Sequence, residues 1–147
     1  MEPHLDRTFE VAAPPEHVWP VVCDLRQTYL HGDPKAIVTM DGPERPIGKL
    51  TVFQLKTGSG LKSTWKVTAW APPRELAYHV DLGVFDGGTT TITIDATPAG
   101  SRILYRVPLI PWPQTWAIVR WMTQPLVRME ARRQGDRFER MVRERIA

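Results

Sequence analysis

Apolar and polar residues alternate along most of the chain, and this period of two predicts β-strands. The first alternating segment is Leu5 to Ala12, where leucine, arginine, phenylalanine and valine share one side. Runs rich in β-branched and aromatic residues predict six more strands: Ala36–Met40, Lys49–Lys56, Leu61–Trp70, Glu75–Leu82, Thr89–Thr97 and Arg102–Leu109. Short turns with glycine or proline separate them, so consecutive strands should pair antiparallel.

The same alternation assigns a face to most strand residues. The inward set is expected to be Trp65, Val67, Leu76, Tyr78, Val80, Ile92, Ile94, Ile103, Tyr105 and Val107. The outward set is expected to be Thr64, Lys66, Thr68, His79, Asp81, Thr91, Thr93, Asp95, Arg102 and Arg106. The facing of the third strand is left open, because Leu50 and Val52 and the opposite set Thr51, Phe53 and Leu55 are both apolar enough.

Helical spacing occurs in two places. After the first strand, Pro14 and Pro15 suit a helix start, and an apolar face follows at Val18, Trp19, Val22 and Cys23. A second short helix or turn is expected to end at His31. The longest helical stretch is Thr115–Ile146, with one apolar stripe at Val119, Met122, Leu126 and Met129 and a second at Val127, Ala131, Phe138 and Met141. Pro125 lies inside it and predicts a kink or a restart.

The predicted order is therefore strand, two short helices, six strands and a long helix. A seven-stranded antiparallel sheet with one solvent-exposed face must bury its other face by curving around a packing partner, and the last helix is the available element. The fold class expected is α+β, with a curved sheet around the C-terminal helix and a space between them. A chain of 147 residues fits one domain, spanning residues 1–147.

Composition changes this picture little. A hydrophobic content of 42% and a charged content of 24% are ordinary for a soluble globular protein. The net charge is only +3, but eight arginines fall between Arg120 and Arg145. A solvated helix face is the first interpretation of these arginines; contact with an anionic membrane surface or an acidic partner is the second, and nucleic acid is not expected. The oligomeric state is left open.

Compartment and membrane topology follow from the same composition. Cys23 is the single cysteine, which excludes an internal disulfide and a cysteine-cluster metal site. No apolar run approaches the length of a membrane-spanning helix, and the N-terminus lacks the apolar core of a signal peptide. We therefore expect a cytoplasmic protein.

Motifs for metal or cofactor chemistry are missing from the sequence. The four histidines show no metal-ligand spacing, and there is no HExxH, Walker, dinucleotide-binding or GxSxG pattern. We therefore expect no metal and no cofactor.

Three segments resemble the START-related helix-grip superfamily, also called SRPBCC, and in particular its polyketide cyclase/dehydrase-like members. They are Ala12–Leu25 (AAPPEHVWPVVCDL), Pro46–Gly48 (PIG) and Trp65–Tyr78 (WKVTAWAPPRELAY). A further point of resemblance is Pro125, the proline in the middle of the last helix. The resemblance spans essentially the whole chain. It implies a deep, mostly apolar cavity between the sheet and the last helix, which holds lipids, sterols, polyketides or hormones.

Polar groups near such a cavity are the candidate catalytic residues. Tyr78 and Tyr105 are expected to point inward, where each hydroxyl needs a partner: a ligand oxygen, the backbone or the other tyrosine. His31 and Asp33 follow the second short helix, a usual cavity rim in this superfamily, and could move protons near neutral pH. An exposed turn is the alternative for these two. The expected cavity wall comprises Trp65, Ile92, Ile103, Trp116, Met122, Leu126 and Met129.

Three functions compete at this point. The first is a pocket that binds a hydrophobic small molecule and catalyses cyclisation or dehydration of a polyketide-type substrate without a cofactor. The second is a carrier or sensor that binds a lipid-like ligand without changing it. The third is a protein that acts at a membrane or partner surface through a tryptophan-rich segment (Trp112, Trp116 and Trp121) and its arginine-rich helix.

Overall fold

A computed structural model describes residues 4–23, 39–41, 52–56, 62–81, 86–109 and 117–146. In chain order its elements are β1 (His4–Val11), α1 (Pro15–Val22), β2 (Thr39–Asp41), β3 (Val52–Lys56), β4 (Lys62–Ala71), β5 (Glu75–Asp81), β6 (Asp86–Thr97), β7 (Gly100–Pro108) and α3 (Ala117–Ile146). The second short helix predicted before His31 lies outside the described residues.

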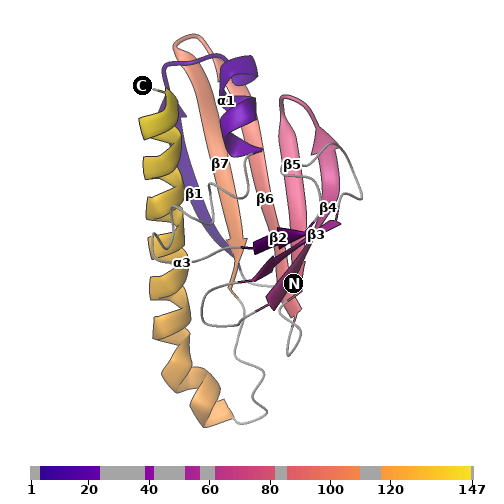
Figure 1. Cartoon of the computed structure of the whole chain (residues 1–147). Coiled ribbons are helices and arrows are strands. Elements are labelled where there is room, and N and C mark those ends of the chain that lie inside the picture. Colours follow the sequence, from indigo (N-terminus) through magenta and orange to yellow (C-terminus); the bar gives the residue numbers. More distant parts are fainter. Residues whose placement is uncertain are drawn as a thin grey trace.

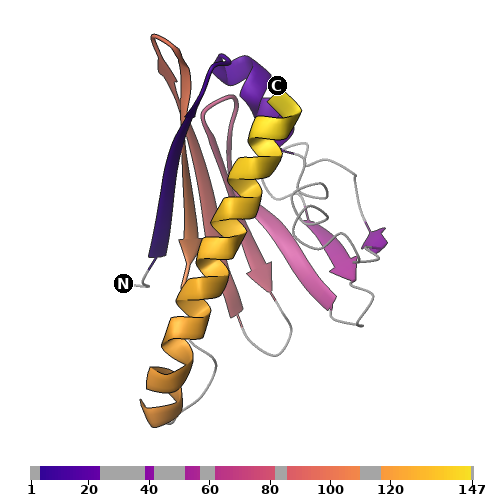
Figure 2. The same ribbon diagram turned by 90° about the vertical axis from the view of Figure 1, so that its left-hand side faces the viewer.

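The strands form one sheet in the order β1-β7-β6-β5-β4-β3-β2, and every neighbouring pair is antiparallel. Consecutive strands from β2 to β7 pair in sequence, and β1 adds to the edge at β7. Both α1 and α3 lie on one face of this twisted sheet (Figures 1 and 2). The predicted α+β class with an antiparallel sheet is confirmed.

Side-chain burial follows the predicted alternation. On the helix-covered face Val67, Leu76, Ile92, Ile94 and Ile103 are fully buried, whereas on the other face Lys66, Asp95, Arg102 and Arg106 are exposed. On the exposed face two arginines of β7 meet carboxylates directly opposite on β1. Arg106 binds both oxygens of Asp6 at 2.8 and 2.9 Å, and Arg102 Nη2 binds Glu10 at 2.9 Å. Solvent-exposed pairs like these add little stability, so they mainly fix the register of β1.

The turn between β6 and β7 packs against the segment that joins β1 to α1. Gly100 has φ +148°, and a Cβ there would lie 2.2 Å from the carbonyl oxygen of Val11, so no other residue fits. Next to it, the buried hydroxyl of Ser101 donates to the carbonyl of Ala13 at 2.6 Å. Pro15 then begins α1 at a position where the missing N–H costs nothing. These contacts place α1 over the end of the sheet.

The long helix α3 is continuous through Pro125, and its N-terminal turns bend and continue past the ends of β1 and β7 (Figures 1 and 2). Its buried stripe is Ala131, Gly135, Phe138 and Val142, which contacts β1, β7 and α1. Of the first predicted stripe, Leu126 and Met129 are 56% and 42% exposed. The expectation that these two side chains pack against the sheet is therefore wrong. The small residues Ala131 and Gly135 bring the opposite stripe closest to the strands.

Candidate functional site

Two tyrosines lie in the middle of the helix-covered face, on β5 and β7. Tyr78 and Tyr105 are 2% and 1% exposed. Their hydroxyl groups are hydrogen-bonded to each other, and Tyr78 also bonds to the buried Thr90 of β6. The pair is a polar centre inside an otherwise apolar core.

Burial dominates the acidity of both hydroxyls. It raises the pKa of Tyr78 to about 12, against the lowering effect of the hydrogen bonds with Tyr105 and Thr90. Burial, with the nearby Tyr78, also raises the pKa of Tyr105 well above 10. Both phenols are neutral at pH 7, so they act as hydrogen-bond donors or acids and not as bases.

Aromatic stacking holds the two tyrosines in place. Trp65 lies on Tyr78 with ring centres 4.9 Å apart, and its indole N–H donates to the buried Ser63 hydroxyl at 2.9 Å. Tyr105 lies on Phe138 of α3 with ring centres 4.2 Å apart. The stack of Tyr105 on Phe138 therefore sets the distance between the sheet and the helix at this level.

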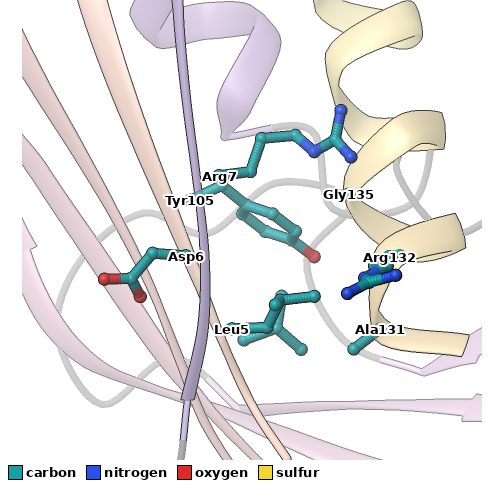
Figure 3. A pocket seen from close by; sticks show the side chains of 8 residues that line it. Leu5, Asp6, Arg7, Tyr105, Ala131, Arg132 and Gly135 are labelled. Atoms are coloured by element: carbon teal, nitrogen blue, oxygen red, sulfur yellow. The ribbon is translucent and has the colours of Figure 1, made fainter. Parts of the chain in front are cut away.

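A pocket of ≈ 200 Å³ lies between the β1–β7 edge of the sheet and α3, and we call it the Tyr105 pocket. Its lining is Leu5, Asp6, Arg7, Tyr105, Val107, Ala131, Arg132 and Gly135. Figure 3 shows the Tyr105 ring in the space between strand and helix, with its hydroxyl on the helix side. The carboxylate of Asp6 points away from this space, toward Arg106 on the exposed face.

Arg7 reaches from β1 to α3 along one side of the Tyr105 pocket. Its guanidinium pairs with Asp136 and lies 4.0 Å from Glu139. Gly135 makes room for it, because a Cβ at that position would lie 2.8 Å from Arg7 Nε. Arg132, the second arginine of the pocket, is exposed and makes no ion pair with the other residues described.

The sequence-predicted site residues fall into three groups. Tyr78, Tyr105, Trp65, Ile92 and Ile103 come together in the buried cluster, where Ile92 is the register partner of Tyr105. Leu126 and Met129 lie on the exposed side of α3, away from this cluster. His31, Asp33 and Trp116 lie outside the described residues, as does the side chain of Met122.

Sequence reasoning missed Thr90, Arg7, Arg132 and Gly135. Arg7 left a signal, because the alternation of the first strand put this charged residue on the apolar side. An arginine at an inward position requires a polar partner or a site. Across the described ranges, no three His, Cys, Asp or Glu side chains are grouped so as to hold a metal ion. No helix in the same ranges is long and apolar enough to cross a membrane.

Comparison with known proteins gives a family match and a fold match. The family model described as "Polyketide cyclase / dehydrase and lipid transport" matches residues 2–143. No curated protein matches the sequence.

Among solved structures, Ara h 8.0201 is similar with a TM-score of 0.68 and 12% identity, covering 97% of this chain and 96% of its own. Protein BH1534 from Bacillus halodurans is similar with a TM-score of 0.66 and 18% identity, covering 97% and 99%. DynU16, encoded in the dynemicin biosynthetic locus, has a TM-score of 0.59 and 13% identity, covering 93% of this chain and 46% of its own. At these identities the structures show a shared fold.

Proposed function

The chain belongs to the polyketide cyclase/dehydrase and lipid transport family, and we propose that it binds a hydrophobic small molecule between the sheet and α3. The ligand class is polyketide-, lipid- or aromatic-like, as the family description suggests. The observation that carries the proposal is the Tyr105 hydroxyl, which is neutral and borders a pocket whose apolar walls are Leu5, Val107 and Ala131.

The polar groups of the Tyr105 pocket indicate what the ligand must offer. Tyr105 and Arg132 both supply hydrogen-bond donors, whereas Asp6 is turned to the other face of the sheet. A ligand with an acceptor oxygen, such as a carbonyl, phenol or carboxylate, would match these donors. A purely hydrocarbon ligand would leave Arg132 desolvated without compensation.

Size limits how much of the ligand this pocket holds. Pockets for drug-sized ligands typically measure about 300–1,000 Å³, and the Tyr105 pocket measures ≈ 200 Å³. It would therefore take one ring or the oxygen-bearing end of a larger molecule.

Catalysis of cyclisation or dehydration is the finer part of the proposal. A neutral tyrosine can polarise a carbonyl by donating a hydrogen bond to its oxygen, which acidifies the neighbouring carbon and favours an aldol step. A proton acceptor is then required, and the two tyrosines are too weakly acidic to be that base at pH 7. His31 and Asp33 remain the proposed base and its partner.

Native mass spectrometry of the purified chain after exposure to polyketide and lipid extracts tests the proposal. A retained ligand of unchanged mass supports a carrier, which is the second candidate function. A ligand lighter by one water supports the cyclase/dehydrase. If the chain retains no ligand from either extract, the proposal fails.

A further inference from the structure

A second stripe of α3 faces away from the sheet. It runs Leu126, Met129, Arg133, Arg137 and Arg140, at spacings of three and four residues, and we call it the outer stripe. The buried stripe runs Ala131, Gly135, Phe138 and Val142 on the opposite side of the same helix. The outer stripe is therefore apolar at its beginning and cationic along the rest.

The apolar beginning of the outer stripe is exposed. Among the described residues the exposed large hydrophobic side chains are Val52, Leu126 and Met129, so two of these three are neighbours on one helix turn. They belong to the N-terminal half of α3, whose first turns continue past the ends of β1 and β7 (Figure 1). Figure 2 looks onto this side and shows α3 in front of the sheet, so a flat surface could approach the helix without meeting a described strand.

Two arginines of the outer stripe have no acidic partner among the described residues. Arg133 and Arg140 are exposed and make no ion pair with any other described residue. The nearby acids are already engaged, since Asp136 pairs with Arg7, and Glu139 lies 3.9 Å from Arg143. Arg128 and Arg132 add exposed positive charge beside Leu126 and Met129.

We propose that the outer stripe is a docking surface for an anionic lipid bilayer. Leucine and methionine enter the boundary of the acyl chains, while the arginines remain at the level of the anionic headgroups. Stable attachment to a bilayer takes two signals, and this stripe combines an apolar one with a cationic one. A second copy of the chain is a poor occupant, because two arginine-bearing stripes repel each other in an isologous contact.

Flotation with vesicles tests the docking surface on the full chain. Wild-type protein is expected to float with phosphatidylcholine vesicles that contain phosphatidylglycerol, and not with pure phosphatidylcholine, and added salt should weaken the binding. Leu126→Gln/Met129→Gln should lower the partition coefficient about tenfold or more without changing net charge. Arg133→Gln/Arg140→Gln should lower it about fivefold per arginine.

Matched control variants test whether vesicle binding depends on the outer stripe or only on total charge and surface hydrophobicity. Lys66→Gln/Arg74→Gln removes two exposed cations elsewhere, and Val52→Gln removes an exposed apolar side chain elsewhere. Both controls should bind vesicles like the wild type. Equal losses in stripe and control variants, or equal binding to neutral vesicles, would overturn the proposal. So would a wild-type dimer in sedimentation velocity that Leu126→Gln/Met129→Gln converts to monomer. Small-molecule binding in the Tyr105 pocket is a separate result, since none of these variants touches that pocket.

Discussion

At the scale of single residues, the Tyr78–Tyr105 pair can stabilise the core or contact a ligand. The two hydroxyls have different surroundings, so these two roles can be tested separately. Tyr105 is hydrogen-bonded to Tyr78 and also lines the Tyr105 pocket, whereas Tyr78 is not part of that lining and has Thr90 as a second partner. Removing one hydroxyl therefore affects the core, and removing the other affects the core and the pocket.

Tyr105→Phe removes one hydrogen-bond partner of Tyr78, whose hydroxyl keeps Thr90, so stability should fall by about 1 kcal/mol. Tyr78→Phe leaves the buried Tyr105 hydroxyl without this hydrogen-bond partner and should cost more, about 1–3 kcal/mol. Ligand affinity should fall only for Tyr105→Phe. Urea denaturation and ligand binding of both variants measure these effects. Unchanged binding by Tyr105→Phe would mean that the pair only completes the core.

At the scale of elements, the contact between β1 and α3 depends on a glycine inside a helix. Glycine in a helix interior costs about 1 kcal/mol relative to alanine, and Gly135 is the place where the Arg7 side chain crosses α3. Glycine is thus required at position 135 by the packing of Arg7 and not by the backbone conformation.

Gly135→Ala should therefore destabilise the protein or leave it unchanged, despite the better helix propensity of alanine. In an Arg7→Ala background the clash is gone, and the same substitution should stabilise by about 0.5–1 kcal/mol. A double-mutant cycle by chemical denaturation compares the two values. Equal effects of Gly135→Ala in both backgrounds would show that Arg7 does not press on this position.

The strands could be predicted from the sequence because one face of the sheet is apolar and the other carries charge. Strand ends shifted, and β6 begins at Asp86, three residues before the expected Thr89, with Gly88 at φ 75°. The rotation of α3 could not be predicted. Its sequence carries two apolar stripes, and the choice between them depends on how closely Ala131 and Gly135 allow the helix to approach β1 and β7. The partners of Arg7 could not be predicted for the same reason. Asp136 and Glu139 lie on α3, and the rotation of this helix decides which of its residues reach β1.

At the scale of the whole molecule, the two tyrosines couple proton binding to folding. An unfolded tyrosine titrates near pH 10, whereas burial raises the pKa of Tyr78 to about 12 and that of Tyr105 well above 10. Above about pH 10 the native state therefore holds protons that the unfolded state has lost. By linkage, stability is complete below this pH and decreases as the pH rises through the native pKa values.

The free energy of unfolding should consequently fall between about pH 10 and about pH 12, by up to about 1.4 kcal/mol per pH unit for each tyrosine. Urea denaturation at a series of alkaline pH values measures the slope. Lysines also titrate in this range, so the control is Tyr78→Phe/Tyr105→Phe, which should lose the tyrosine part of the slope and keep the rest. Tyrosinate absorbance gives an independent reading: two of the three tyrosines should ionise only as the protein unfolds. A wild-type slope equal to that of the double variant would place both hydroxyls in contact with solvent.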